Sequence, residues 1–123
     1  MTGRIDVVGL GPGSPELLTV ETRELLRRNP VLLRTRHHPT VTALDPDGAW
    51  ESCDDLYQRG ESFDEVYAAV VERVLARARA VATVYAVPGH PLVAERTVTG
   101  LLVAARASGV EVQVHAAVSF ADV

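Results

Sequence analysis

The stretch Ile5-Asp6-Val7-Val8-Gly9-Leu10-Gly11-Pro12-Gly13-Ser14-Pro15 joins a short apolar run to a turn rich in glycine and proline. It predicts a buried β-strand that ends abruptly, because glycine permits a sharp turn and proline makes the turn stiff. A helix is expected to follow, with Thr19 as its N-cap and with Arg27 and Arg28 in its last turn. A strand, a turn and a helix in this order form the repeating unit of α/β proteins.

Further strands follow along the chain. Residues 31–33 predict a second short strand, and residues 50–53 predict a third after a turn signal. Residues 81–87 are continuously apolar, which is typical of a central parallel strand that is covered on both faces. Residues 110–115 alternate valine with polar residues, which indicates an edge strand with one wet face. The pattern predicts a three-layer α/β fold, an open parallel sheet with helices on both faces.

Two more helices are predicted between these strands. Ser62 and Glu65 have the spacing of a capping box, and an apolar stripe runs from Phe63 onward at helical spacing. A later helix is expected to begin near Pro91, where a first-turn proline is tolerated, and to end at Gly109.

Length and composition limit the kind of protein. The 123 residues correspond to one domain, 1–123, and 47% hydrophobic with 23% charged residues is an ordinary globular balance. The net charge of −4 argues against a nucleic-acid partner, and no apolar run approaches the ~20 residues that span a bilayer. The single cysteine, Cys53, cannot form an internal disulfide, so a cytoplasmic location is expected.

The candidate binding loops follow the strands. Ligands of open parallel sheets bind at the carboxyl ends of the strands, here in loops 9–15, 34–39, 88–91 and 115–119. Loop 88–91 is expected at the N-terminus of a helix, where an anionic group is favoured, although a plain stiff turn is the alternative.

A dinucleotide site is a competing interpretation of the first loop. Ser14 stands where the GxGxxG fingerprint needs its last glycine, and Pro12 removes an amide that would hold a phosphate. NADP binding stays open because Arg34 and Arg36 follow the second strand, where a 2′-phosphate would be met.

No metal site is expected. His37, His38 and His115 have no partner at metal-ligand spacing and are interpreted as loop histidines. Glu21 and Glu24 belong to the first half of a helix and are interpreted as a solvated face.

Three segments together resemble one family. The opening run, extended to Thr19, is similar to the first loop of the tetrapyrrole (corrin/porphyrin) methylases. Residues 86–97 resemble the GDP loop of that family, in the form seen where such a domain is fused to a MazG-type nucleotide pyrophosphohydrolase. Val118-Ser119-Phe120 resembles the end of its PGVS segment. The resemblance covers residues 4–122 and only the first of two α/β domains, and it implies the strand order 3-2-4-1-5.

The resemblance implies S-adenosylmethionine as the cofactor, bound in a cleft between the two domains. The cofactor contacts carried over from the family fall on Pro12, Pro88, Gly89, His90, Val93, Ser119 and Phe120. Three places differ from the family pattern: His90 stands where many members have aspartate, Ala116-Ala117 replaces the usual Pro-Gly, and Arg34 stands where the uroporphyrinogen methylases have an acid.

The function implied is that of a methyltransferase module for a small-molecule acceptor, tetrapyrrole-like or unknown, which is incomplete and inactive alone. An uncovered apolar face is expected to favour a homodimer. The alternative is a non-catalytic ligand-binding or regulatory module associated with a MazG-type hydrolase.

Overall fold

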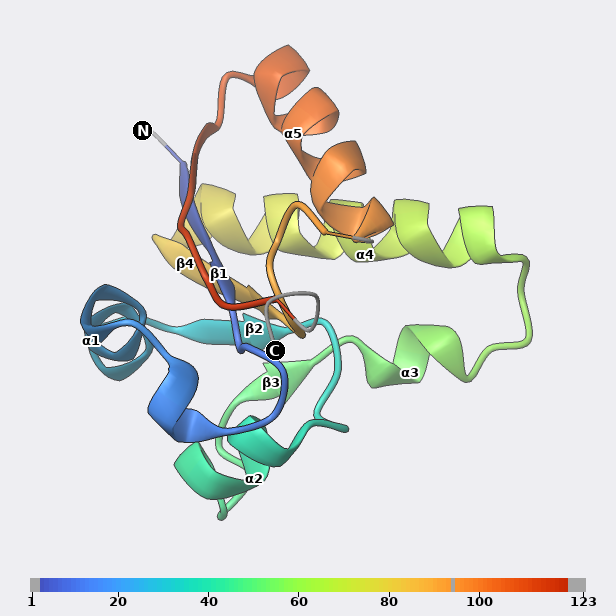
Figure 1. The fold of residues 1–123 in the computed structure, drawn as a ribbon. Helices are drawn as coiled ribbons and strands as arrows, with labels where there is room; N and C mark the ends of the chain where they lie inside the picture. The colour runs from blue at the N-terminus through green and yellow to red at the C-terminus, as the bar shows by residue number, and fades with distance from the viewer. Residues whose placement is uncertain (1–2, 94, 120–123) are drawn as a thin grey trace.

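The computed structural model describes residues 3–93 and 95–119. Along the chain (Figure 1) the elements are β1 (Arg4–Gly9), the 3-10 helix η1 (Pro15–Leu17), α1 (Val20–Arg28), β2 (Val31–Leu33), α2 (Pro39–Leu44), β3 (Glu51–Ser52), α3 (Asp54–Tyr57), α4 (Phe63–Ala80), β4 (Thr83–Val87), α5 (Arg96–Ser108) and β5 (Glu111–Val114).

The strands form one parallel sheet in the order β3-β2-β4-β1-β5. This order confirms the expected 3-2-4-1-5 arrangement. The apolar strand β4 is central and fully buried, whereas β5 lies at the edge beside β1, with Arg4 opposite Glu111 and Val7 opposite Val114. The burial of each strand therefore follows its hydrophobic pattern.

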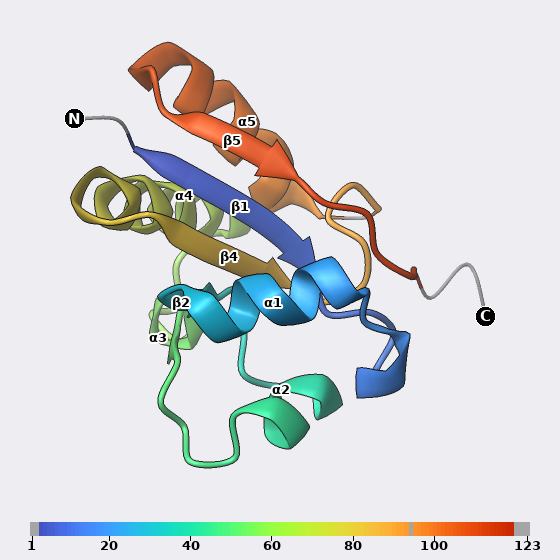
Figure 2. The ribbon, with the colours of Figure 1, turned by 90° about the vertical axis from the view of Figure 1, so that its left-hand side faces the viewer.

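Helices cover both faces of the sheet. Figure 2 shows α1 in front of the sheet and α4 and α5 behind it. On β1, Val7 packs with α4 and α5, whereas Val8 packs with α1 and α2, because successive side chains of a strand point to opposite faces. Tyr85 and Val84 of β4 divide in the same way. The three-layer α/β fold is confirmed.

Several local predictions are confirmed. The Thr19 side chain accepts a hydrogen bond from the amide of Thr22 at the start of α1. Ser62 and Glu65 form the capping box of α4. Gly109 ends α5 with a φ of 72°, a left-handed conformation that glycine adopts without strain.

Two expectations about the helices are wrong, and two short helices were not predicted. Helix α5 begins at Arg96, not near Pro91, because Glu95 is the N-cap and accepts from the amide of Thr97. Phe63 is 73% exposed instead of belonging to the buried stripe, since it occupies the first turn of α4 beyond the sheet. Helices α2 and α3 were not predicted, because elements of six and four residues carry too little periodicity to show in a sequence.

Within the described ranges, the helices are all too short or too polar to span a membrane.

Candidate functional site

Two of the candidate loops are joined by backbone hydrogen bonds. The amide of Gly11 donates to the carbonyl of Gly89 at 3.2 Å, and the amide of Gly89 donates to the carbonyl of Gly11 at 3.0 Å. Both residues have positive φ angles, 73° and 66°, which glycine tolerates best. This antiparallel bridge lies just beyond the parallel β1–β4 pairing and fixes loop 9–15 against loop 88–91.

Gly9 brings a third loop to the same place. A Cβ atom on Gly9 would overlap the carbonyl oxygen of Gly89 and would lie 2.6 Å from the Cβ of Ala117 and 3.0 Å from the Cδ of Pro91. Glycine is therefore required at this position, because the three loops meet without room for a side chain. We call Gly9, Gly11 and Gly89 the glycine junction.

Loop 34–39 supports the glycine junction through His38. Its Nδ1 accepts from the amide of Thr40 at 3.2 Å, so the neutral ring carries its proton on Nε2, which donates to the carbonyl of Gly11 at 3.0 Å. Burial and the nearby positive charge of Arg34 lower the pKa of His38 from its usual value. A neutral His38 is thus a structural partner of the first loop.

The predicted cofactor residues are distributed along this edge. Pro12, Pro88, Gly89 and His90 are partly buried, and Val93 is exposed. Ser119 is buried, and the preceding Val118 carbonyl lies close to Gly11. Phe120 lies outside the described residues. The structure brings loops 9–15 and 88–91 together, and their contact with a cofactor stays a prediction.

His90 closes a turn and does not lie at a helix N-terminus. Its Nδ1 accepts from the amide of Leu92 at 3.0 Å, and its carbonyl accepts from the amide of Val93 at 3.1 Å. An aspartate closes a turn in the same way with a carboxylate oxygen. Because Nδ1 is an acceptor here, Nε2 of the neutral ring is a donor, which suits a carboxylate and not an ammonium group.

A polar network that the sequence did not indicate lies behind the loops. The Nε of Arg34, at the end of β2, is 3.0 Å from Oε2 of Glu95, and its Nη1 donates to the Tyr57 hydroxyl at 3.4 Å. Glu95 accepts from the Thr97 hydroxyl, whose oxygen lies 2.8 Å from the Tyr85 hydroxyl. The network holds a charged arginine at the carboxyl edge.

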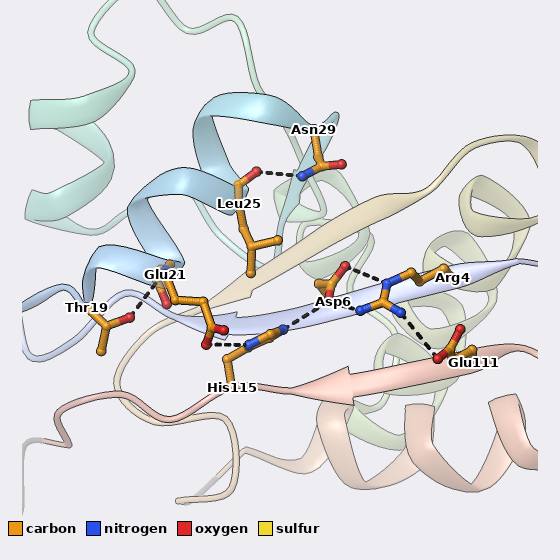
Figure 3. Close-up of polar contacts among 9 residues, drawn as sticks. Arg4, Asp6, Thr19, Glu21, Leu25, Asn29, Glu111 and His115 are labelled. Atoms are coloured by element: carbon orange, nitrogen blue, oxygen red, sulfur yellow. Dashed lines mark hydrogen bonds and ion pairs between the residues drawn. The ribbon is translucent and has the colours of Figure 1, made fainter.

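A second unexpected cluster lies where β5 ends. His115 Nδ1 lies 2.9 Å from Oε1 of Glu21, and His115 Nε2 lies 2.9 Å from Oδ1 of Asp6 (Figure 3). Arg4 donates twice to Asp6, at 3.0 and 3.1 Å, and forms an ion pair with Glu111. His115 follows β5 directly and is buried, so the expectation of an exposed loop histidine is wrong in its exposure. We call Asp6, Glu21 and His115 the histidine junction.

The charges of the histidine junction follow from these contacts. Burial lowers the pKa of His115, but the hydrogen bonds to Asp6 and Glu21 outweigh it and leave that pKa above its usual value. Burial raises the pKa of Asp6, but Arg4 and His115 leave it below its usual value. A sequence signal for this cluster was the single histidine in an otherwise valine-rich alternation.

The described residues offer little support for a metal site or a cysteine nucleophile. In the described part of the chain, no group of three or more histidine, cysteine, aspartate and glutamate side chains is arranged to hold a metal ion. Burial raises the pKa of the Cys53 thiol to about 11, so the nucleophilic thiolate is scarce at neutral pH.

Solved structures resemble this fold. Uroporphyrin-III-C-methyltransferase from Thermus thermophilus superposes with a TM-score of 0.72 at 24% identity, over 97% of this chain and 49% of that one. The enzyme of the same name and organism complexed with S-adenosylhomocysteine gives a TM-score of 0.67 at 32% identity, over 95% and 46%. The cobalamin biosynthetic enzyme cobalt precorrin-4 methyltransferase gives 0.68 at 22% identity, over 94% and 46%.

A curated protein, the uncharacterized protein YabN of Bacillus subtilis (strain 168), is 38% identical over 124 residues, which is 99% of this chain and 25% of YabN. The chain thus spans about half of the solved methyltransferases and a quarter of YabN. Residues 4–123 match the Tetrapyrrole (Corrin/Porphyrin) Methylases. Fold, loops and sequence agree, and the chain belongs to the tetrapyrrole methylase family.

Proposed function

We propose that this chain is the cofactor-binding half of an S-adenosylmethionine-dependent methyltransferase of the tetrapyrrole methylase type. The observation that carries the proposal is the glycine junction, which brings two loops that resemble the family's cofactor loops to one edge of the sheet. The similarity to a methyltransferase complexed with S-adenosylhomocysteine, at 32% identity, supports the same ligand class.

The residues at this edge fit such a ligand. A Cβ on Gly89 would meet nothing within 4 Å, so the backbone of loop 88–91 is open to an approaching ligand. The proton on Nε2 of His90 suits the carboxylate end of the ligand, and Pro12 supplies a stiff apolar wall. We assign cofactor binding to Pro12, Pro88, Gly89, His90, Val93, Ser119 and Phe120.

The proposed chemistry demands positioning more than acid–base catalysis. When bound, S-adenosylmethionine supplies an activated methyl group, which the acceptor's nucleophilic atom takes as the carbon–sulfur bond breaks and S-adenosylhomocysteine leaves. The chain's own residues bind and orient the reactants and exclude water. This division of labour agrees with a site built from glycine, proline and backbone amides.

We propose that a second α/β domain completes the cleft, since the chain spans about half of the solved methyltransferases. The isolated chain then binds its cofactor weakly, does not turn over, and associates through exposed apolar residues such as Leu92 into a homodimer. The acceptor is a small molecule, tetrapyrrole-like or of another kind, and the compartment is the cytoplasm.

Calorimetric titration of the chain with S-adenosylmethionine, S-adenosylhomocysteine and NADP tests the proposal. We expect weak binding of the first two and none of NADP. Binding of NADP alone would favour a dinucleotide site instead. Methyl transfer to a tetrapyrrole by the purified chain would show that no second domain is needed, and a monomeric sedimentation profile at high concentration would contradict the homodimer.

A regulatory module associated with a MazG-type nucleotide pyrophosphohydrolase is the second candidate. The chain covers 49% of a solved methyltransferase but 25% of YabN, so YabN is about twice as long (49/25) and has room for a further unit. A stable complex with such a hydrolase, together with no binding of S-adenosylmethionine, would favour this candidate.

A further inference from the structure

The end of β5 lies at the edge of the sheet, and the segment 116–119 follows it directly. Strand β5 pairs with β1, and just beyond the strand the amide of His115 donates to the carbonyl of Val7 at 3.0 Å. The side chain of His115 adds a second attachment, to Asp6 on β1 and to Glu21 on α1. Figure 3 shows the imidazole between these two carboxylates.

The two contacts require a charged ring. A carboxylate accepts hydrogen bonds, so a histidine that bonds to two carboxylates donates from both nitrogens and is an imidazolium. The side chains of His115 and Asp6 are each 9% exposed, which strengthens the attraction between them. The charged groups that face the ring are Arg4 and Asp6 of β1 and Glu21 of α1, with Glu111 of β5 bound to Arg4.

When the His115 ring loses one proton, the histidine junction loses its contact with Glu21 and keeps its contact with Asp6. A neutral ring keeps one donor, and Asp6 retains it best because two hydrogen bonds from Arg4 hold its carboxylate in place. The Glu21 side chain is 68% exposed, so water solvates it, and the N-terminus of α1 stabilises its charge. Nδ1 of the neutral ring then points a lone pair at the Glu21 carboxylate, so this contact is lost, whereas Leu26 keeps α1 packed on the sheet.

This contact joins the segments that carry the proposed cofactor residues. Glu21 lies in α1, which follows the loop containing Pro12, whereas His115 precedes the segment containing Ser119. We propose that His115 is a positioning residue of the cofactor edge: as an imidazolium that bridges Asp6 and Glu21, it holds segment 116–119 against the first loop. The consequence for ligand binding rests on the proposed function, whereas the effect on the protein alone does not.

The test is an NMR titration of the isotope-labelled 123-residue chain between about pH 5 and about pH 9, which covers the range where histidine titrates. We expect the His115 ring to titrate above the usual histidine value, and the amides of Ser119 and Gly13 to shift with the same midpoint. Glu21→Gln lowers that midpoint. Glu24→Gln removes one charge from the same helix without touching His115, and it should leave the midpoint unchanged.

The same samples are then titrated with S-adenosylhomocysteine. We expect affinity to fall by about fivefold as pH rises through the His115 midpoint, a modest coupling between separate sites, and the fall to move with Glu21→Gln. The positioning role would be overturned if the amide signals of segment 116–119 did not shift at the His115 midpoint. It would also be overturned if Glu21→Gln and Glu24→Gln changed that midpoint equally. No binding at any pH with intact coupling would overturn the proposed function and leave the positioning role standing.

Discussion

The glycine junction and the histidine junction both fix segments that follow the ends of strands, and different forces hold them. Gly11 and Gly89 are joined by backbone amides, and Gly9 leaves no space for a side chain. The end of β5 is held by an imidazole between two carboxylates. Backbone amides do not titrate in the physiological range, whereas imidazole does. The backbone hydrogen bonds of the glycine junction therefore do not depend on pH, whereas the side-chain contacts of the histidine junction do.

The largest effect is expected from Gly9→Ala, which breaks the glycine junction. The new Cβ would overlap the Gly89 carbonyl and press on Ala117, so the loops have to separate, at a cost of about 3 kcal/mol in the free energy of unfolding. Urea denaturation measures this loss. Gly100→Ala is the control, because its Cβ would meet Val71 at 3.4 Å, and a helical alanine is intrinsically favourable. A loss below about 1 kcal/mol for Gly9→Ala would show that the loops are loosely joined.

A smaller effect, on ligand affinity, is expected from His90→Asp, which leaves the glycine junction intact. One carboxylate oxygen can accept from the Leu92 amide as the imidazole does, and the other is free to bind the ammonium group of S-adenosylmethionine. This charge-assisted bond replaces the weaker bond that Nε2 of neutral His90 offers to the ligand's carboxylate. Calorimetry should show about tenfold tighter binding, which corresponds to ~1.4 kcal/mol. His90→Asn keeps the turn acceptor without the charge and should gain much less. Equal gains for the two variants would mean that the ammonium group does not reach this loop.

Next in size is the effect of His115→Gln, which breaks the histidine junction. The pKa of His115 is raised in the folded protein, so its stabilisation is fully present below the unfolded value of about 6.5 and is lost as pH rises through the folded value. We expect a loss of about 1 kcal/mol in the free energy of unfolding near pH 6, and the loss should fade at alkaline pH. The loss is small because the Glu21 contact is largely solvated. Urea denaturation across pH measures it. His37→Gln, which removes an exposed histidine outside the histidine junction, is the control.

The smallest effect is expected from Phe63→Ala, which touches neither junction. Phe63 is exposed and stacks on Tyr67 within the first turns of α4, so its removal should change the free energy of unfolding by no more than about 0.5 kcal/mol. Thermal unfolding is a sufficient measurement. A larger loss would indicate that Phe63 is covered in solution, for instance by a second copy of the chain.

Much of the fold was predictable because its signals are local. The capping box of Ser62 and Glu65, the apolar run of β4 and the alternation of β5 each lie within a few residues and were confirmed. The start of α5 was not, because a proline near position 91 is compatible with a helix start and also with the turn that His90 closes. Only the placement of Glu95 beside Arg34 and Thr97 distinguishes the two.

The sequence by itself determined the strands, the central position of β4, the edge position of β5 and the turns of glycine and proline, because hydrophobic period and turn chemistry are properties of neighbouring residues. Tertiary structure alone decided what His115 and Arg34 do. Glu21 and Asp6 lie 94 and 109 positions from His115 along the chain. Glu95 is likewise far from Arg34 in the sequence. No local pattern records such pairs, since side chains from separate elements meet only after the sheet has set its strand order.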